Sequence, residues 1–130
     1  MTMKIHHEIS INANPQRIFE ALTDAKQFAE LTGAPADIDL VSGGLFSCFD
    51  GMITGQTIEA IPGTRLVQAW RVGNWDPGIY SIVKFEFEAL SDLETNLIFD
   101  HTGFPDEHRD HFDQGWHDRY WQPLINYVNA

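Results

Sequence analysis

Apolar and polar residues alternate at the start of the chain and then change to a helical spacing. From Ile5 to Ile11 every second residue is apolar or histidine, which predicts a half-buried strand. Asn14-Pro15 has the residue types of a helix cap followed by the first helical position, so a short helix is expected next. Asp24 predicts the cap of a second short helix, which we expect to end at Gly33.

The middle of the chain consists of runs rich in Val, Ile, Phe, Trp and Thr, separated by glycine and proline turn signals. These runs predict further strands, and the short turns indicate antiparallel neighbours. The expected strands cover residues 36–41, 45–50, 52–61, 64–72, 79–90 and 94–102. The alternation is clearest in the last two expected strands, 79–90 and 94–102. It predicts that one set of their residues lies on the inner face of the sheet, namely Val83, Phe85, Phe87 and Ala89 together with Leu97, Phe99 and His101.

After Pro105 the apolar spacing becomes helical. Phe112, Trp116, Tyr120 and Leu124 recur every four residues, which predicts one long C-terminal helix, with a kink or break at Pro123. The whole order predicts a single α+β domain over residues 1–130. In it, a curved antiparallel sheet of about six to seven strands wraps around the C-terminal helix, with two short helices after the first strand.

Charge and cysteine content narrow the classes of function. The 130 residues include 19 acids and 8 bases, for a formal net charge of −11, so nucleic acid and anionic membranes are not expected as partners. Cys48 is the single cysteine, which rules out an internal disulfide and a cysteine-based zinc site. The sequence has no signal-peptide-like or membrane-spanning apolar run, so a cytoplasmic location is expected.

The sequence contains none of the common phosphate-binding, nucleophile-elbow, zinc-protease or redox motifs. A cluster of acids and histidines after Pro105 is the best metal candidate, with Glu107, His108, Asp110, His111, Asp113 and His117. Its spacing matches no strong zinc pattern, so a solvated acidic helix start is the preferred interpretation. We therefore expect neither a metal nor a cofactor.

Aromatic residues are plentiful, and a helix held across a concave sheet often leaves a cavity. The candidate cavity residues are Phe46, Cys48, Trp70, Phe85, Phe87, Phe99, His101, Trp116 and Trp121. His101 is either a core histidine satisfied by hydrogen bonding or a polar anchor for an apolar ligand. His7 has the same two interpretations. Trp75, in a loop, is expected to pack against the rim, to cover the cavity mouth or to contact a partner.

Several segments resemble a known family when taken in order. Asn14–Thr23 resembles the first helix of the START-like (SRPBCC) superfamily. Gly43–Phe46, Trp70-Arg71, His101–Pro105 and Gly115-Trp116 resemble a narrower group, the C-terminal domain family of the activator of the 90-kDa heat-shock protein ATPase. The resemblance covers about residues 9–128 and implies the helix-grip fold, in which sheet and last helix enclose an apolar cavity. The family's co-chaperones carry a further N-terminal docking domain, so full activation is not expected of this chain.

Three hypotheses about function follow. The first is a non-enzymatic binding module that uses the cavity for a small hydrophobic ligand or its surface for a protein partner. The second, implied by the resemblance, is a co-chaperone-like regulator of the 90-kDa heat-shock protein ATPase. The third is a cyclase or dehydratase in which His101 serves as acid and base inside the cavity. The absence of catalytic motifs favours a protein that is not an enzyme.

Overall fold

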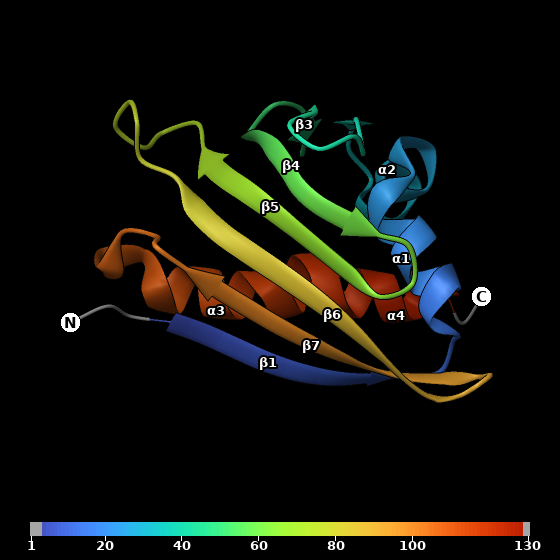
Figure 1. Ribbon diagram of the computed structural model, residues 1–130. Coiled ribbons are helices and arrows are strands. Elements are labelled where there is room, and N and C mark those ends of the chain that lie inside the picture. Colours follow the sequence, from blue (N-terminus) through green and yellow to red (C-terminus); the bar gives the residue numbers. More distant parts are fainter. Residues whose placement is uncertain (1–3, 129–130) are drawn as a thin grey trace.

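Strand β1 (Lys4–Ile11) begins the part of the chain, residues 4–128, that this computed structural model describes. It pairs antiparallel with the last strand, β7 (Glu94–Thr102), with Ile5 opposite His101 and Ile11 opposite Thr95. Ile5 and Ile11 are fully buried, as the alternation predicts. The first and last strands of the chain are therefore neighbours in the sheet (Figure 1).

Two capped helices follow β1. Helix α1 (Pro15–Thr23) begins after Asn14, whose side chain accepts a hydrogen bond from the Arg17 amide. Helix α2 (Ala25–Thr32) begins after Asp24, whose carboxylate accepts hydrogen bonds from the backbone amides of Lys26 and Gln27. The helix ends at Gly33, which has a left-handed φ of 77°. Both helices have the caps expected from the sequence.

The remaining strands form a meander that returns to β1. They are β2 (Asp37–Ile38), β3 (Leu45–Cys48), β4 (Ile53–Ile61), β5 (Arg65–Val72), β6 (Ser81–Ser91) and β7. The sheet order is β1-β7-β6-β5-β4-β3-β2, and all of the pairs are antiparallel. The predicted strand 36–41 is shorter in the structure, where β2 ends at Ile38. Asp39 starts a turn in which its carboxylate accepts a hydrogen bond from the Val41 backbone amide.

The inner face of the sheet carries the residues that the alternation predicts, with one exception. Phe85 on β6 lies opposite Phe99 on β7, and their ring centroids are 5.1 Å apart. Ala89 is expected to face inward but is exposed, although it still pairs in register with Thr95. Thr95 is buried and the register shift comes only after Ala89, so the exposure of Ala89 accompanies its place near the end of the hairpin and not a change of face.

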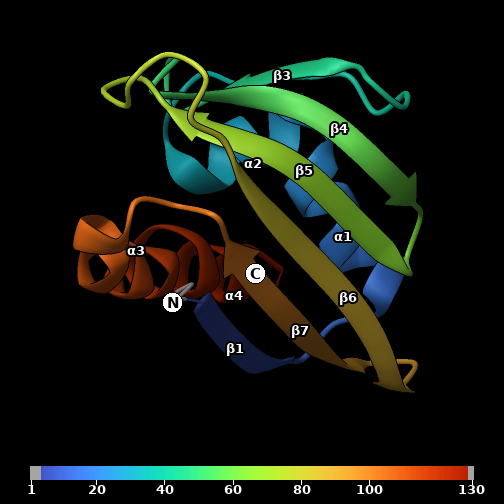
Figure 2. The ribbon, with the colours of Figure 1, turned by 60° about the vertical axis from the view of Figure 1, so that its left-hand side comes forward.

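The C-terminal helical segment lies against one face of the sheet, which curves around it (Figure 2). It consists of a 3₁₀ turn, η1 (Asp106–His108), then α3 (Arg109–Trp116), a π-helical turn, η2 (His117–Trp121), and α4 (Gln122–Val128). Pro123 does not break the helix, although it cannot donate a backbone hydrogen bond. The wider π turn directly precedes it, and the Gln122 amide donates five residues back to His117. The arrangement is the helix-grip fold.

The core lies between the sheet and these helices. Helices α1 and α2 also contact α4, so all three border the same interior. Among the described residues, no helix is long and apolar enough to cross a membrane.

Candidate functional site

Trp116 and Trp121 face the sheet together although they are five residues apart. In a regular α-helix, side chains at this spacing point about 140° away from each other. The π turn accommodates an additional residue, and the two indoles stack with centroids 5.6 Å apart and an interplanar angle of 22°. The irregular turn before Pro123 therefore builds an aromatic layer on the sheet.

The indole of Trp116 is a hydrogen-bond partner of the His101 ring. The Trp116 Nε1–H donates to His101 Nδ1 at 3.1 Å, which leaves the imidazole proton on Nε2. His101 Nε2 then donates to the Ser81 hydroxyl at 2.8 Å. The ring is 0 % exposed, and burial lowers its pKa from 6.5 to about 3, so it is neutral at pH 7. No ring nitrogen is left to exchange a proton with a bound molecule.

The second indole satisfies His7 in the same way. Trp121 Nε1–H donates to His7 Nδ1 at 2.8 Å, and His7 Nε2 lies 2.7 Å from Asp113 Oδ1. Because Nδ1 accepts, Nε2 carries the proton and donates to the carboxylate. Both histidines therefore tie the C-terminal helical segment to the sheet through their hydrogen bonds.

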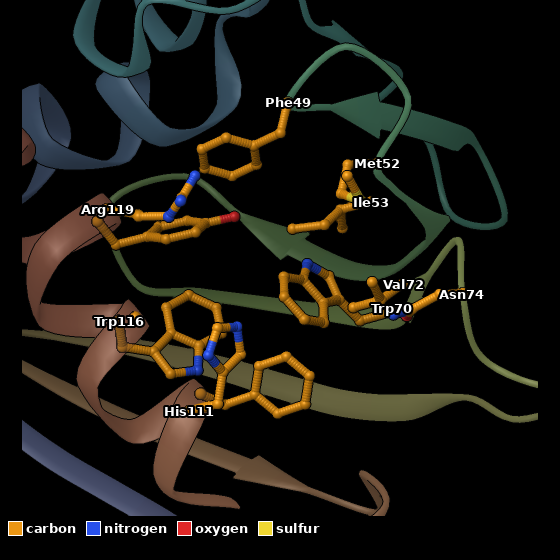
Figure 3. Close-up of a pocket in the computed structure, with 12 residues that line it drawn as sticks. Phe49, Met52, Ile53, Trp70, Val72, Asn74, His111, Trp116 and Arg119 are labelled. Atoms are coloured by element: carbon orange, nitrogen blue, oxygen red, sulfur yellow. The ribbon is translucent and has the colours of Figure 1, made fainter. Parts of the chain in front are cut away.

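Beyond Trp116, the interface between helix and sheet opens into a pocket of about 350 Å³ (Figure 3). This volume falls within the range of small-molecule sites. The sheet contributes Ile53, Trp70 and Val72, and the helical segment contributes Phe112, Gly115, Trp116 and Tyr120. The rim consists of Phe49, Met52, Asn74, His111 and Arg119.

Two local features shape this space. Gly115 gives the helix no side chain there, and a Cβ built on it would have no atom within 4 Å. Phe49 follows β3 with a left-handed φ of 53°, a conformation that is uncommon and costly for a bulky residue. This backbone holds the Phe49 ring 5.6 Å from Tyr120. The side chain thus forms the rim opposite the helix.

Two polar groups that line the pocket, the Trp70 indole N–H and the Arg119 guanidinium, have no acceptor or ion-pair partner within residues 4–128. Trp70 is 3 % exposed, and its Nε1–H has no hydrogen-bond acceptor within residues 4–128. In Figure 3 this nitrogen is on the ring edge that faces Ile53 and Phe49. Arg119 extends across the rim toward Phe49, and no carboxylate of the described chain pairs with it. None of the described residues that line the pocket is an Asp or a Glu.

Tyr120 lines the pocket, and Cys48 lies beside it on a separate void. Burial raises the pKa of Tyr120, and the neighbouring Cys48 thiol raises it further. Burial likewise raises the pKa of the Cys48 thiol to about 12, so that it is neutral and unreactive as a nucleophile. Trp70 opposes the rise in the pKa of Tyr120, which places the hydroxyl in its neighbourhood, although the indole N–H does not reach hydrogen-bond geometry.

The predicted cavity residues are all buried, but the structure divides them. Trp70 and Trp116 line the pocket. Phe46, Cys48 and Phe85 border a separate void of about 10 Å³, which has room for little more than one water molecule. The other predicted residues pack in the core and border neither space, namely Phe87, Phe99, His101 and Trp121. The open volume is therefore displaced from the centre of the predicted cavity toward α3.

Trp75 and the acid–histidine cluster do not form sites of their own. Trp75 is 6 % exposed and packs edge-to-face on Phe112 at 5.8 Å, which leaves little of its ring to cover the mouth or contact a partner. His108 contacts Phe112, His111 lies on the pocket rim, and His117 lies against His7. Among the described residues, no three His, Cys, Asp or Glu side chains are placed to hold a metal ion.

Several pocket residues were not predicted. Gly115 carried a usable signal, because a glycine inside a helical pattern suggests a close approach or an open space. Tyr120 was assigned to the apolar stripe but not to the cavity. Phe49 and Met52 flank the Asp50-Gly51 turn, where the facing of side chains cannot be derived from alternation. Arg119 lies in the π turn, which regular helical spacing does not anticipate.

Sequence comparison relates this chain to a family of known proteins. Residues 12–129 match the family model described as Activator of Hsp90 ATPase homolog 1-like protein. The chain is 26 % identical over 123 residues to the activator of 90 kDa heat shock protein ATPase homolog 1 of Homo sapiens. It is 27 % identical over 115 residues to the corresponding homolog of Dictyostelium discoideum. These matches cover 95 % and 88 % of this chain but 36 % and 30 % of the relatives, so the chain spans about a third of their length.

Solved structures extend the likeness to the whole fold. An HSP90 activator from Plasmodium falciparum superposes with a TM-score of 0.91 at 26 % identity, over 98 % of this chain and 96 % of that chain. The Aha1 dimer from Colwellia psychrerythraea shares the fold, with a TM-score of 0.79 at 20 % identity over 98 % of this chain and 95 % of that one. The family match covers nearly all of the chain, which therefore belongs to the Activator of Hsp90 ATPase homolog 1-like family.

Proposed function

We propose that this domain binds a 90-kDa heat-shock chaperone and regulates its ATPase activity. The observation that carries the proposal is the match to the Plasmodium falciparum HSP90 activator, which extends over 96 % of that chain. The likeness extends over the backbone of nearly the whole domain. The expected site of this function is the cytoplasm.

The charge of the chain is consistent with such a partner. A net charge of −11 on 130 residues creates a strong field around a small domain. A field of this kind accelerates association with a basic surface and weakens as salt is added. We therefore expect binding to the chaperone to be faster at low ionic strength.

An ATPase assay with the chaperone from the same organism tests the proposal. We expect the turnover of the chaperone to change when the domain is added to saturation, measured as the part of the signal that a chaperone-specific inhibitor abolishes. The Trp121→Ala variant, whose core is disrupted, is the control: if the effect on the chaperone requires the folded domain, this variant should show less of it. An unchanged rate at saturation, together with no binding by calorimetry, would remove this function.

The pocket favours a second function, the binding of a small apolar ligand. Its volume of about 350 Å³ and its aromatic lining are the supporting observations. Native mass spectrometry of freshly purified protein, compared with the same sample after denaturation, tests it. We expect a mass excess that disappears on denaturation and that is absent from a Gly115→Leu variant, whose added side chain would occupy the pocket.

A further inference from the structure

The indole N–H of Trp70 is a buried donor for which the protein supplies no acceptor within residues 4–128. A buried polar group left unsatisfied costs about 1–3 kcal/mol, so folded proteins rarely retain one without a reason. Trp70 lines the pocket, and its nitrogen is on the ring edge that faces the Ile53 and Phe49 side. The nitrogen is itself closed to solvent, so an oxygen atom of a bound molecule accepts this hydrogen bond and removes the penalty only when the side chains that cover it shift.

Charge at the pocket indicates what kind of molecule carries that oxygen. The protein has 19 acids and 8 bases, yet the described residues lining the pocket include no carboxylate. They do include Arg119, whose guanidinium has no ion-pair partner in the described chain, and His111. A cationic ligand would find no counter-charge in the pocket, whereas an anion would find one.

The walls determine the rest of the ligand. Trp70 stacks on Trp116 with centroids 5.4 Å apart, and Phe112 meets Trp70 edge-on at 6.2 Å. Rings arranged in this way favour another flat ring, which can stack on one face and meet the edge of another. One guanidinium matches a single negative charge, and the surrounding charge of −11 opposes a dianion such as a phosphate monoester.

We propose that this pocket binds a small aromatic monocarboxylate. The ring lies among Trp70, Phe112 and Trp116, a ligand oxygen accepts the Trp70 N–H, and the carboxylate is balanced by Arg119. The proposal rests on the second proposed function, small-ligand binding in this pocket, and adds the chemical class of the ligand. It is independent of whether the domain regulates a chaperone.

Calorimetry with three probes of nearly equal size tests the charge of the head group. The probes are 2-naphthoate, its neutral amide 2-naphthamide, and the cation 2-naphthylmethylammonium. We expect 2-naphthoate to bind about tenfold more tightly than the amide, because a charge-assisted contact is worth about 1.4 kcal/mol more than a neutral one in a partly exposed site. We expect the cation to bind more weakly than both.

Variants test the residues that recognise the ligand. Arg119→Gln is expected to weaken 2-naphthoate about tenfold and to leave the amide unchanged, a difference that general damage to the fold would not produce. Lys26→Gln is the matched control, because it removes the same charge from an exposed position on α2, outside the pocket. Trp70→Phe keeps a ring but removes the N–H, and is expected to weaken both the acid and the amide.

The Gly115→Leu variant separates failure of the site from failure of the ligand class. It is expected to abolish binding of the acid and the amide while the protein remains folded, because the added side chain enters open space. Equal affinity for acid and amide, lost in Gly115→Leu, would overturn the carboxylate and leave the pocket as a ligand site. No binding of 2-naphthoate, or binding that Gly115→Leu does not alter, would overturn both. If Trp70→Phe does not fold, the Arg119 and Gly115 variants still decide the outcome.

Discussion

The interface between helix and sheet has two halves that are built from the same residue types but packed differently. The closed half contains His7, Phe99, His101 and Trp121, and the open half is the pocket that begins at Trp70. Trp116 separates them, stacked on Trp121 at 5.6 Å on one side and on Trp70 at 5.4 Å on the other. In the closed half both histidines and both helical indoles have hydrogen-bond partners, whereas the Trp70 N–H in the open half has none.

This difference shows that aromatic content alone does not make a binding site. In the closed half the π turn aligns two indoles so that each meets an imidazole, and the space is filled. In the open half the helix presents Gly115, and the Phe49 ring meets Tyr120 only at one edge of the space. Filled space with satisfied polar groups stabilises the fold, while open space with an unsatisfied donor is available to a ligand.

Truncation of a large side chain in each half gives the largest contrast. Trp121→Ala is expected to lower the free energy of unfolding by about 3–5 kcal/mol, because it leaves a cavity and unpairs the His7 ring. Met52→Ala, at an open-half position that is 57 % exposed, is expected to cost less than about 0.5 kcal/mol. Urea denaturation followed by circular dichroism measures both. Equal losses would mean that the two halves are packed alike.

Acid is expected to weaken the closed half through His101. The unfolded chain takes up a proton at a pKa near 6.5, whereas the buried ring stays neutral until a pKa of about 3. Between these values the unfolded state binds more protons, so the free energy of unfolding falls as the pH falls. The contribution between pH 6.5 and about pH 4.5 is roughly 2–3 kcal/mol.

Denaturation curves of the protein and of a His101→Asn variant across this pH range measure that contribution. The variant is less stable at neutral pH but should lose less stability on acidification. Exposed His6, whose pKa is raised by its hydrogen bonds to Glu8 and Asp100, is present in both proteins and does not affect the difference between them. Parallel pH profiles would show that His101 is accessible to protons, contrary to its place in the closed half.

The closed half was largely predictable from the sequence and the open half was not. Alternation along β6 and β7 placed Phe85, Phe99 and His101 inward, and the period of four placed Trp116 on the buried face. These assignments follow from regular geometry. The pocket depends on departures from it, namely the left-handed turn at Phe49 and the π turn that carries Arg119. Side-chain spacing in the sequence does not encode such departures.

A substitution at Gly115 is the most specific test of the open half. Gly115→Ala should raise the free energy of unfolding by about 0.5–1 kcal/mol, because alanine is the better helix former and its methyl group meets no atom within 4 Å. Gly55→Ala on β4 is the matched control, since there a Cβ would collide with the Ala69 carbonyl and lie 2.8 Å from Phe46. That variant should be clearly destabilised. A higher melting temperature for Gly115→Ala beside a lower one for Gly55→Ala would show that the helix faces open space at residue 115. Destabilisation by both would mean that the pocket is closed in solution, and the ligand site would be lost with it.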